Sequence, residues 1–435
     1  MSTLTAPALA SRLLSPELDG RDPTSLADHL ALRGELPPLR GDDAAWVAAM
    51  LQAVADSGLS GRGGAGFPSA RKLAGIRRAG GTPLVVVNAM EGEPESLKDK
   101  VLLTAVLHLV LDGAAVAAAL LGARRVVVCL PADDPSGTAE VLRRAVAERA
   151  RAGRSGVEVV VAARPGGYAA GEESALVEGL NDRPGLPIFR ADKATPLRVG
   201  RAPALVHNAE TLAHLALIAR HGAAWFRSAG TAASPGTTLV TVAGAVVRPG
   251  VFEVELGCPI DVICAAAGAP DDVAGVLVGG YAGTWLGPQH LGTPFERGAL
   301  AELGATTGVG VLVVLAASSC GITETARIAR YMAGESAGQC GPCVFGLPAL
   351  AEDLELLAVG RAGPTTMDRL RGRASLIAGR GACRHPDGVV RLVESALVAF
   401  ADDLERHARG HACRGTAAPS VLNIPRNARP GRRAA

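Results

Sequence analysis

Three short apolar runs, separated by stretches with helical periodicity, constrain the fold of this chain more than any other feature. They cover residues 84–87, 125–130 and 157–162, and valine is their most frequent residue. Residues 101–121 and 138–152, which lie between these runs, have the length and the apolar pattern of helices. Because strands that alternate with helices pair in parallel, we predict an α/β domain built on a parallel sheet.

The composition limits the classes of protein to which the chain can belong. Its 435 residues leave room for about two to four domains, and its net charge of +2 gives no general affinity for nucleic acid. Residues 1–22 lack the basic and apolar regions of a signal peptide, so we expect a cytoplasmic protein. The stretch 101–121 reaches transmembrane length, but His108 and Asp112 lie near its middle, so we expect a buried helix there.

Sequence patterns in the rest of the chain indicate further structural units. Residues 239–247 and 251–256 flank an Arg-Pro-Gly turn and predict a hairpin, and residues 260–267 predict a short helix. Patterns of Ala, Leu and Arg from Thr323 onward indicate a helical domain. The predicted parts are an N-terminal extension at 1–40, the α/β domain at 41–235, a small α+β module at 236–300, the helical domain at 301–413 and a disordered basic tail at 414–435.

A glycine-rich segment at 58–68 is the first candidate for a binding site. Its glycines fit the dinucleotide pattern G-x-G-x-x-G, but that pattern has meaning only between a strand and a helix. Here the segment follows a predicted helix that begins after Asp43 and ends at Gly58. Its backbone N–H groups could approach a phosphate or a flat ring, with Arg62 or Lys72 as the positive charge. On these residues alone, a cofactor cradle and an ordinary loop are equally good interpretations.

Four further segments occur in an order that resembles one known family. They are Asn-Ala-Met-Glu-Gly-Glu-Pro at 88–94, Gly-Glu-Glu-Ser-Ala-Leu at 171–176, Asn-Ala-Glu-Thr-Leu at 208–212 and Glu-Ser-Ala-Gly-Gln-Cys-Gly-Pro-Cys at 335–343. With the glycine-rich segment, they resemble the FMN-binding NADH dehydrogenase subunit of respiratory complex I and its relatives in NAD-reducing hydrogenases and formate dehydrogenases. The resemblance covers roughly residues 25–410.

The resemblance implies a fold and a cofactor site. The α/β domain would be a Rossmann-like flavin domain, the module at 236–300 a β-grasp (SLBB-like) insertion, and the helical domain the carrier of an iron–sulfur cluster. From the residues alone, Glu172 and Glu173 could instead complement a helix dipole, and Asn208 and Thr211 could be capping or core residues. The cofactor-binding residues implied by the resemblance are Gly61, Arg62, Gly63, Gly64, Gly66, Phe67, Lys72, Asn88, Glu91, Glu93, Gly171, Glu172, Glu173, Phe189, Asn208 and Thr211.

Three departures from the family's pattern fall around the nicotinamide site. The family has an Asp where this chain has Met90 and a Lys where it has Leu186, so two polar partners are missing. A second aromatic residue shortly after Lys72 is also absent, although Phe67 and Phe189 are retained. The resemblance therefore implies a complete FMN site and a partly stripped site for NAD(H), which leaves the electron donor open.

Three of the eight cysteines form a second candidate site. Two residues separate Cys340 from Cys343, and 39 separate Cys343 from Cys383, which is part of the four-thiolate pattern of a 4Fe–4S cluster. The family's first cysteine is here Ala337, which cannot bind iron. A zinc site with three cysteines and one histidine is the chemical alternative. The candidates for the fourth ligand are Cys320, Cys413, His385 and an external water or thiol, and the position could also have no ligand.

The resemblance implies an oxidoreductase that passes electrons from NADH through FMN to an iron–sulfur cluster and then to a partner protein. That partner would be ferredoxin-like or a 2Fe–2S subunit, in the cytoplasm or at the cytoplasmic face of the membrane. A second interpretation, favoured by Met90 and Leu186, is an electron-transfer module without NADH activity that exchanges electrons with a ferredoxin-type partner. A scaffold without cofactors is disfavoured, because the loop keeps every glycine of the family.

Overall fold

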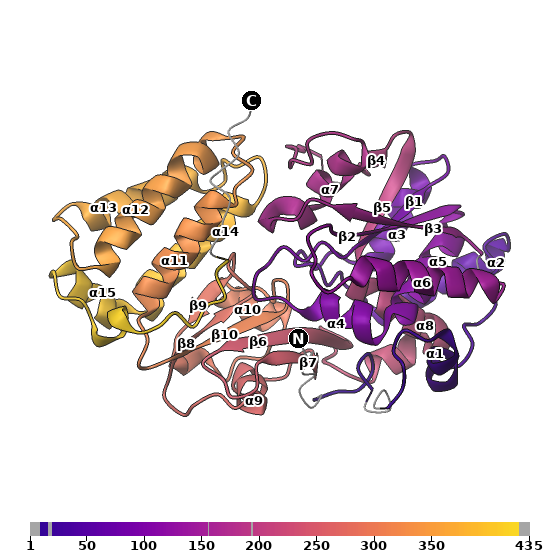
Figure 1. Ribbon diagram of the computed structural model, residues 1–435, viewed down its shortest axis with the longest axis horizontal. Helices are drawn as coiled ribbons and strands as arrows, with labels where there is room; N and C mark the ends of the chain where they lie inside the picture. Colours follow the sequence, from indigo (N-terminus) through magenta and orange to yellow (C-terminus); the bar gives the residue numbers. More distant parts are fainter. Residues whose placement is uncertain (1–8, 16–19, 155, 193–194, 426–435) are drawn as a thin grey trace.

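The structure is a computed structural model that describes residues 9–15, 20–154, 156–192 and 195–425. In Figure 1, a sheet covered by helices occupies one side of the molecule and a bundle of helices occupies the other. A second sheet lies next to both of them. The chain passes through these three units in order, which agrees with the sequence of parts predicted above.

The first sheet contains five strands in the order β3-β2-β1-β5-β4. β1 (Leu84–Asn88), β2 (Arg125–Pro131) and β3 (Glu158–Arg164) are the three predicted strands, and their parallel pairing confirms the α/β fold. β5 (Ala202–Asn208), which the sequence does not predict, also pairs in parallel with β1. β4 (Arg198–Val199) pairs antiparallel with β5 at the edge.

Helices cover both faces of this sheet. Asp43 caps α2 and Gly58 ends it in the left-handed conformation, as the sequence predicts. On the opposite face, α7 (Glu173–Leu180) packs through a smaller apolar cluster that includes Leu176 and Met90. The helices that share the larger core are α2 (Ala44–Ser57), α3 (Ser69–Arg78), α5 (Leu107–Leu121), α6 (Thr138–Arg151) and α8 (Ala209–Arg227).

The single helix predicted at 101–121 is wrong, because the chain forms two helices there. α4 (Lys98–Ala105) and α5 meet at Val106, whose φ of −144° and ψ of 35° leave the helical region, and the two axes differ by 95°. Most of α5 is buried, as predicted. Among the described residues, no single helix is long and apolar enough to cross a membrane, and α4 and α5 meet that test only as a bent pair.

The second sheet has the strand order β7-β6-β10-β8-β9. β6 (Thr237–Gly244) and β7 (Gly250–Glu255) form the predicted hairpin, and α9 (Ile260–Ala266) is the predicted short helix. β10 (Val311–Ala316) lies between β6 and β8 (Val273–Val278). The prediction that the helical domain starts at residue 301 is therefore wrong, because this buried strand belongs to the sheet. The other elements of this unit are β9 (Thr284–Leu286) and α10 (Arg297–Glu302).

The C-terminal unit is helical, as predicted. The disorder predicted from residue 414 is wrong for residues 414–425, because Leu422 is buried in the core of the bundle and the segment makes hydrogen bonds. Residues 426–435 lie outside the described residues. The helices are α11 (Gly321–Gly334), α12 (Leu347–Ala358), α13 (Thr366–Ile377), α14 (His385–Ala399) and α15 (Ala401–Ala408), and α1 (Leu26–Arg33) belongs to the N-terminal extension.

Candidate functional site

The carboxyl ends of β1 and β5 meet at the centre of the predicted flavin site. Asn88 and Asn208 are paired neighbours at these ends, and the Asn208 amide donates to the Asn88 carbonyl at 3.3 Å. The Asn88 amide donates to the Gly171 carbonyl at 2.9 Å. The backbone N–H of Arg62 donates to Thr211 Oγ1 at 2.9 Å. Four predicted segments therefore meet at the sheet edge where α/β folds place ligands.

The glycines of the site differ in the room that they leave for a side chain, and Gly171 and Gly66 are the crowded ones. A Cβ on Gly171 would lie 2.5 Å from a carbonyl oxygen of the loop after β1, and one on Gly63 would lie 3.4 Å from Asn208 Cβ. Gly66 has a φ of +60°, and its carbonyl accepts a hydrogen bond from the Arg297 guanidinium at 2.7 Å. Bare backbone of this kind can approach a phosphate or a ring closely, so these residues fit FMN.

The remaining loop residues shape this cradle. The Gly61 N–H donates to the Phe67 carbonyl at 2.9 Å, which closes the loop on itself. Gly64 has a φ of +103°, a conformation that glycine adopts without strain. Phe67 and Phe189 keep 47% and 72% of their surface exposed, so both rings are available to a flat partner.

The two predicted cations of the loop differ in their surroundings. The Arg62 guanidinium is buried and donates to the Thr237 carbonyl at 3.0 Å, so this side chain is held in the interior. Lys72 Nζ is partly exposed, 2.6 Å from the Val206 carbonyl and 3.1 Å from the Glu173 carboxylate. The structure therefore favours Lys72 over the Arg62 side chain as the positive charge for a phosphate.

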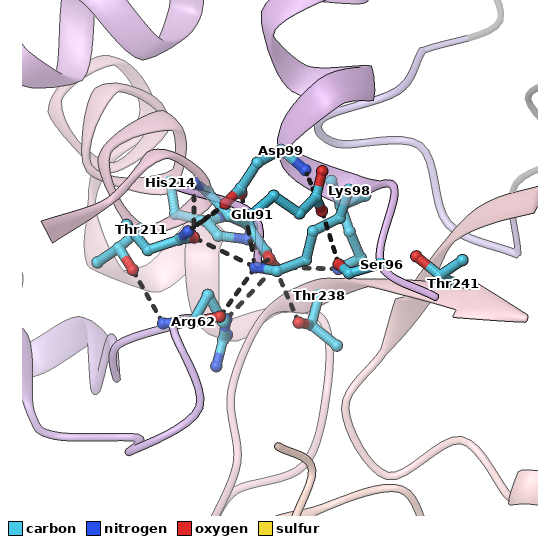
Figure 2. A network of polar contacts seen from close by, with 12 residues as sticks. Arg62, Glu91, Ser96, Lys98, Asp99, Thr211, His214, Thr238 and Thr241 are labelled. Carbon is cyan, nitrogen blue, oxygen red and sulfur yellow. Dashed lines mark hydrogen bonds and ion pairs between the residues drawn. The ribbon is translucent and has the colours of Figure 1, made fainter. Parts of the chain in front are cut away.

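A buried network that the sequence analysis missed supports the loop (Figure 2). Lys98 Nζ donates to the Arg62 carbonyl at 2.8 Å and lies 2.7 Å from a Glu210 carboxylate oxygen. Glu210 also accepts the Thr238 hydroxyl at 2.8 Å, which extends the network from α8 to β6. The only signal in the sequence was a charged run next to an apolar stretch, which is also typical of a solvated helix end.

The charges of this network are balanced in the interior. Burial raises the pKa of Glu210, but Lys98, His214 and Arg62 together outweigh it and hold that pKa below its usual range. The pKa of Lys98 is raised by Glu210 and Asp99, against the opposing effect of burial. Burial raises the pKa of Asp99 to about 7, and its carboxylate accepts the Asn208 amide at 2.8 Å. A charged pair therefore fixes the position of the loop carbonyl.

The two predicted glutamates after β1 have different contacts. Glu91 Oε1 accepts the Ser96 hydroxyl at 2.6 Å, which holds it near the start of α4. Glu93 Oε2 accepts the Tyr281 N–H at 2.9 Å and the Tyr168 hydroxyl at 3.2 Å, where the three units meet. Its Oε1 has no partner among the described atoms. Burial raises the pKa of Glu93 to about 8, so it is mainly a neutral acid at pH 7.

We expect Glu93 to make the stability of the cofactor-free protein depend on pH. Glu93 keeps its proton in the folded state but loses it in the unfolded chain between about pH 5 and 8, so the free energy of unfolding falls as the pH rises. The slope from one such group is at most about 1.4 kcal/mol per pH unit. Glu93→Gln should flatten this slope in urea titrations, and the exposed control Glu158→Gln should not. Equal slopes in the Glu93→Gln variant and the parent would contradict the assignment.

Glu172 and Glu173 lie at the start of α7. The Glu172 carboxylate accepts the N–H groups of Ser174 and Ala175 at 3.0 and 2.9 Å, so this residue caps α7 at the end where a carboxylate also complements the helix dipole. Glu173 pairs with Lys72. The first turn of α7 therefore has two roles: Glu172 caps the helix, and Glu173 lies beside the glycine cradle.

Cys340, Cys343 and Cys383 lie close enough to interact with one another, and Cys383 also interacts with Glu172 of that turn. Burial, with the neighbouring Cys340 and Cys383 thiols, raises the pKa of Cys343 to about 12. The pKa of Cys383 is also raised, first by burial and then by groups that include Glu172 and Cys340. Three convergent thiols suit an iron–sulfur cluster, whereas Ala337 offers no ligand atom.

Two hydrogen bonds hold the cysteine loop against the flavin domain. Gln339 donates to the Pro187 carbonyl at 2.8 Å. The Glu335 carboxylate, at the end of α11, accepts the Tyr168 N–H at 3.0 Å. The predicted flavin site and the predicted cluster site are therefore neighbours, although about 170 residues separate them in the sequence.

The protein residues considered for a fourth ligand are engaged elsewhere. Cys320 and Cys413 form a separate group with His407. His385 Nε2 lies 2.8 Å from the Met332 carbonyl, inside the bundle. The structure therefore does not group Cys320, Cys413 or His385 with Cys340, Cys343 and Cys383, which leaves an external ligand or no fourth ligand.

A bare glycine cradle at the carboxyl edge of a parallel sheet, with three convergent thiols beside it, defines a flavin and iron–sulfur electron-transfer protein. Residues 54–217 match the family model of the Nuo51 FMN-binding domain, and residues 323–407 match that of the NADH-ubiquinone oxidoreductase-F iron-sulfur binding region. The chain belongs to the family of the F subunits of NADH-quinone oxidoreductases, which confirms the resemblance.

Individual relatives agree with this membership. The chain is 33% identical over 384 residues to the F subunit of the NADH-quinone oxidoreductase of Mycobacterium bovis, covering 84% of this chain and 85% of that protein. It is 28% identical over 406 residues to the NADP-reducing hydrogenase subunit HndC of Solidesulfovibrio fructosivorans, covering 90% and 82%. A chain of the air-oxidised NAD+-reducing NiFe hydrogenase superposes with a TM-score of 0.79 at 32% identity, covering 92% of this chain and 67% of that chain.

Proposed function

We propose that this chain is the NADH-oxidising subunit of an electron-transfer complex, with FMN in the glycine cradle and an iron–sulfur cluster on Cys340, Cys343 and Cys383. The observation that carries the proposal is the proximity of the two sites, since Gln339 beside Cys340 donates to the Pro187 carbonyl at 2.8 Å and the Tyr168 N–H donates to Glu335 at 3.0 Å. Bound FMN supplies the conversion of a two-electron transfer into single-electron transfers. The names of the relatives, which include NADH-quinone and NAD+-reducing enzymes, support NADH as the donor.

The chain's own residues would hold and orient this cofactor. The loop backbone from Gly61 to Gly66, with Lys72, would bind the phosphate and ribityl chain, because bare glycine backbone allows close approach and Lys72 supplies a cation beside β5. Glu93, as a neutral acid, can donate a hydrogen bond from its unpartnered oxygen. The residues that would surround the rest of the flavin are Asn88, Glu91, Gly171, Glu172, Glu173, Asn208 and Thr211, and Phe67 and Phe189 would offer aromatic faces to the nucleotide.

We expect NADH to bind about 10- to 1,000-fold more weakly than to a relative with the usual Asp and Lys, because two polar contacts worth about 0.7–2 kcal/mol each are missing. Met90 is 6% exposed and packs in an apolar cluster with Leu176, so it offers no polar atom to a nucleotide. Rapid mixing with NADH, followed by the loss of flavin absorbance, measures the affinity.

Two variants make this measurement decisive. Leu186→Lys restores one partner at a half-buried position and should tighten NADH binding, and Met90→Asp with Leu186→Lys should tighten it further. Full reduction of the parent at micromolar NADH would show that the substitutions are harmless. Failure of all forms with NADH, together with reduction by a reduced ferredoxin, would favour the electron-transfer module without NADH activity.

The partner in this proposal is a ferredoxin-like protein or a 2Fe–2S subunit at the cytoplasmic face of a membrane. Homology to subunits of multi-subunit enzymes supports an electron-accepting partner in general. Co-purification of the tagged chain from its own cells, with iron and mass-spectrometric analysis of bound proteins, would identify the partner.

A further inference from the structure

Cys320, His407 and Cys413 form a second cluster of metal-binding side chains, separate from the three thiols assigned above. Cys320 is the N-cap of α11, His407 lies in the last turn of α15, and Cys413 follows that helix. Cys320 Sγ lies 3.4 Å from His407 Nε2, and the three ligand atoms all lie within 4.8 Å of one another. Zinc bonds of about 2.3 Å to sulfur and 2.0–2.1 Å to nitrogen, at tetrahedral angles, require separations of about 3.5 Å for S and N and 3.8 Å for two S atoms.

The surroundings of the cluster suit bound sulfur ligands. Cys320 and His407 are 1% and 0% exposed, so water does not surround these two ligand atoms. The Thr323 N–H donates to Cys320 Sγ at 3.3 Å, and Thr416 Oγ1 lies 3.6 Å from Cys413 Sγ. Donors of this kind orient thiolate ligands and stabilise their charge.

Two glycines allow the loop after α15 to pack closely beside this cluster. A Cβ on Gly415 would lie 2.5 Å from the Cys320 backbone nitrogen, so only glycine allows the loop to pack on the start of α11. Gly360 has a φ of +67°, and a Cβ there would lie 3.1 Å from the Gly410 carbonyl oxygen. The loop is therefore held close to α11 and α12 on both sides of Cys413.

The segment after the cluster, residues 413–425, crosses the bundle to the flavin side, and we call it the C-terminal strap. The Ser420 hydroxyl donates to the Glu324 carboxylate of α11 at 2.8 Å. The Asn423 N–H donates to Glu95 Oε1 at 2.6 Å, and the Tyr281 hydroxyl donates to the same oxygen at 2.9 Å. Tyr281 also donates its N–H to Glu93, so the strap ends at the junction where the three units meet.

We propose that Cys320, His407 and Cys413 bind one zinc-type divalent cation, with a water or added thiol as the fourth ligand, and that this metal fastens the C-terminal strap across α11. Two thiolates and one imidazole select zinc over magnesium, calcium or manganese. This proposal does not depend on the proposed redox function, because the structure groups Cys320, His407 and Cys413 apart from the flavin residues and from Cys340, Cys343 and Cys383.

The test is the zinc content of the full-length protein, purified anaerobically, incubated with zinc and passed through gel filtration. We expect about one zinc per chain, and at least a tenfold lower zinc affinity in Cys320→Ser, His407→Ala and Cys413→Ser. Cys264→Ser changes another buried cysteine and should keep the zinc. Cys343→Ser should keep it as well and lose only iron, which separates this site from the cluster site.

Two further readouts keep the test decisive. Cobalt in place of zinc should give an intense thiolate-to-cobalt absorption that Cys413→Ser, at a half-buried loop position, weakens without unfolding the chain. Removal of zinc should speed proteolysis within the strap. Zinc retention that is unchanged in all three variants, no zinc in the parent, or a Cys320–Cys413 disulfide in the anaerobic protein would overturn the proposal.

Discussion

A valine in place of Gly66 should abolish flavin binding. Gly66 has a φ of +60°, which a β-branched residue adopts only with strain, and a Cβ there would lie 2.4 Å from an Arg297 guanidinium nitrogen. Because this guanidinium also holds the Ala65 and Gly66 carbonyls, the whole turn has to move. We expect FMN to fall from about one per chain to less than a tenth of that.

The control for this experiment is Gly292→Val, at an exposed position with a permissive φ and open space around it. Flavin is measured by absorbance after gel filtration, and circular dichroism verifies the fold of both variants. Gly63→Val should act in the same direction but less strongly, because its Cβ would meet only Asn208 Cβ at 3.4 Å. A Gly66→Val protein that is folded and carries full flavin would remove the glycine loop from the flavin site.

Replacement of Cys343 by alanine should remove the iron–sulfur cluster. Cys343 is 3% exposed and interacts with both of the other thiols, and its loss leaves only two thiolate ligands. Ala337→Cys should have the opposite effect, because a fourth thiolate replaces a weaker external ligand. We expect higher iron content or slower loss of iron in air for Ala337→Cys, with a shifted reduction potential.

Iron and sulfide analysis with low-temperature EPR of anaerobic protein measures these changes. Cys258→Ala, which alters a half-buried cysteine in the second sheet unit, is the matched control and should keep the cluster. About one zinc and no iron at these three residues, or an EPR signal that Cys343→Ala leaves unchanged, would show that they are not cluster ligands.

Much of the fold follows from local patterns in the sequence. The valine-rich runs become β1, β2 and β3, and the Arg-Pro-Gly turn becomes the hairpin of β6 and β7. β5 escapes prediction because Pro203, which cannot donate a ladder hydrogen bond, argues against a strand at the centre of a sheet. The break at Val106 has no marker such as glycine or proline, so periodicity alone predicts one continuous helix.

Some features of the candidate site also follow from the sequence, and others depend on the packing of the helices. The meeting of Asn88 with Asn208 follows from two strands that end at one edge, but because β5 was not predicted, only the resemblance placed both residues in one site. The Lys98–Glu210 pair and the Cys320–His407–Cys413 cluster join residues about 110 and 90 positions apart, and no spacing rule links them. Only the packing of α4, α8, α11 and α15 brings these groups together, and the tail after residue 413 gains its order from the same packing.

The central claim is that one chain carries a flavin and an iron–sulfur cluster in neighbouring sites. Its most direct test is an anaerobic reductive titration of the purified protein with dithionite. Flavin and cluster are followed by absorbance and by EPR. We predict an uptake of about three electrons per chain, two by the flavin and one by the cluster, and loss of the one-electron part in Cys343→Ala. A protein that binds neither flavin nor iron after anaerobic reconstitution, and takes up no electrons, would contradict this claim.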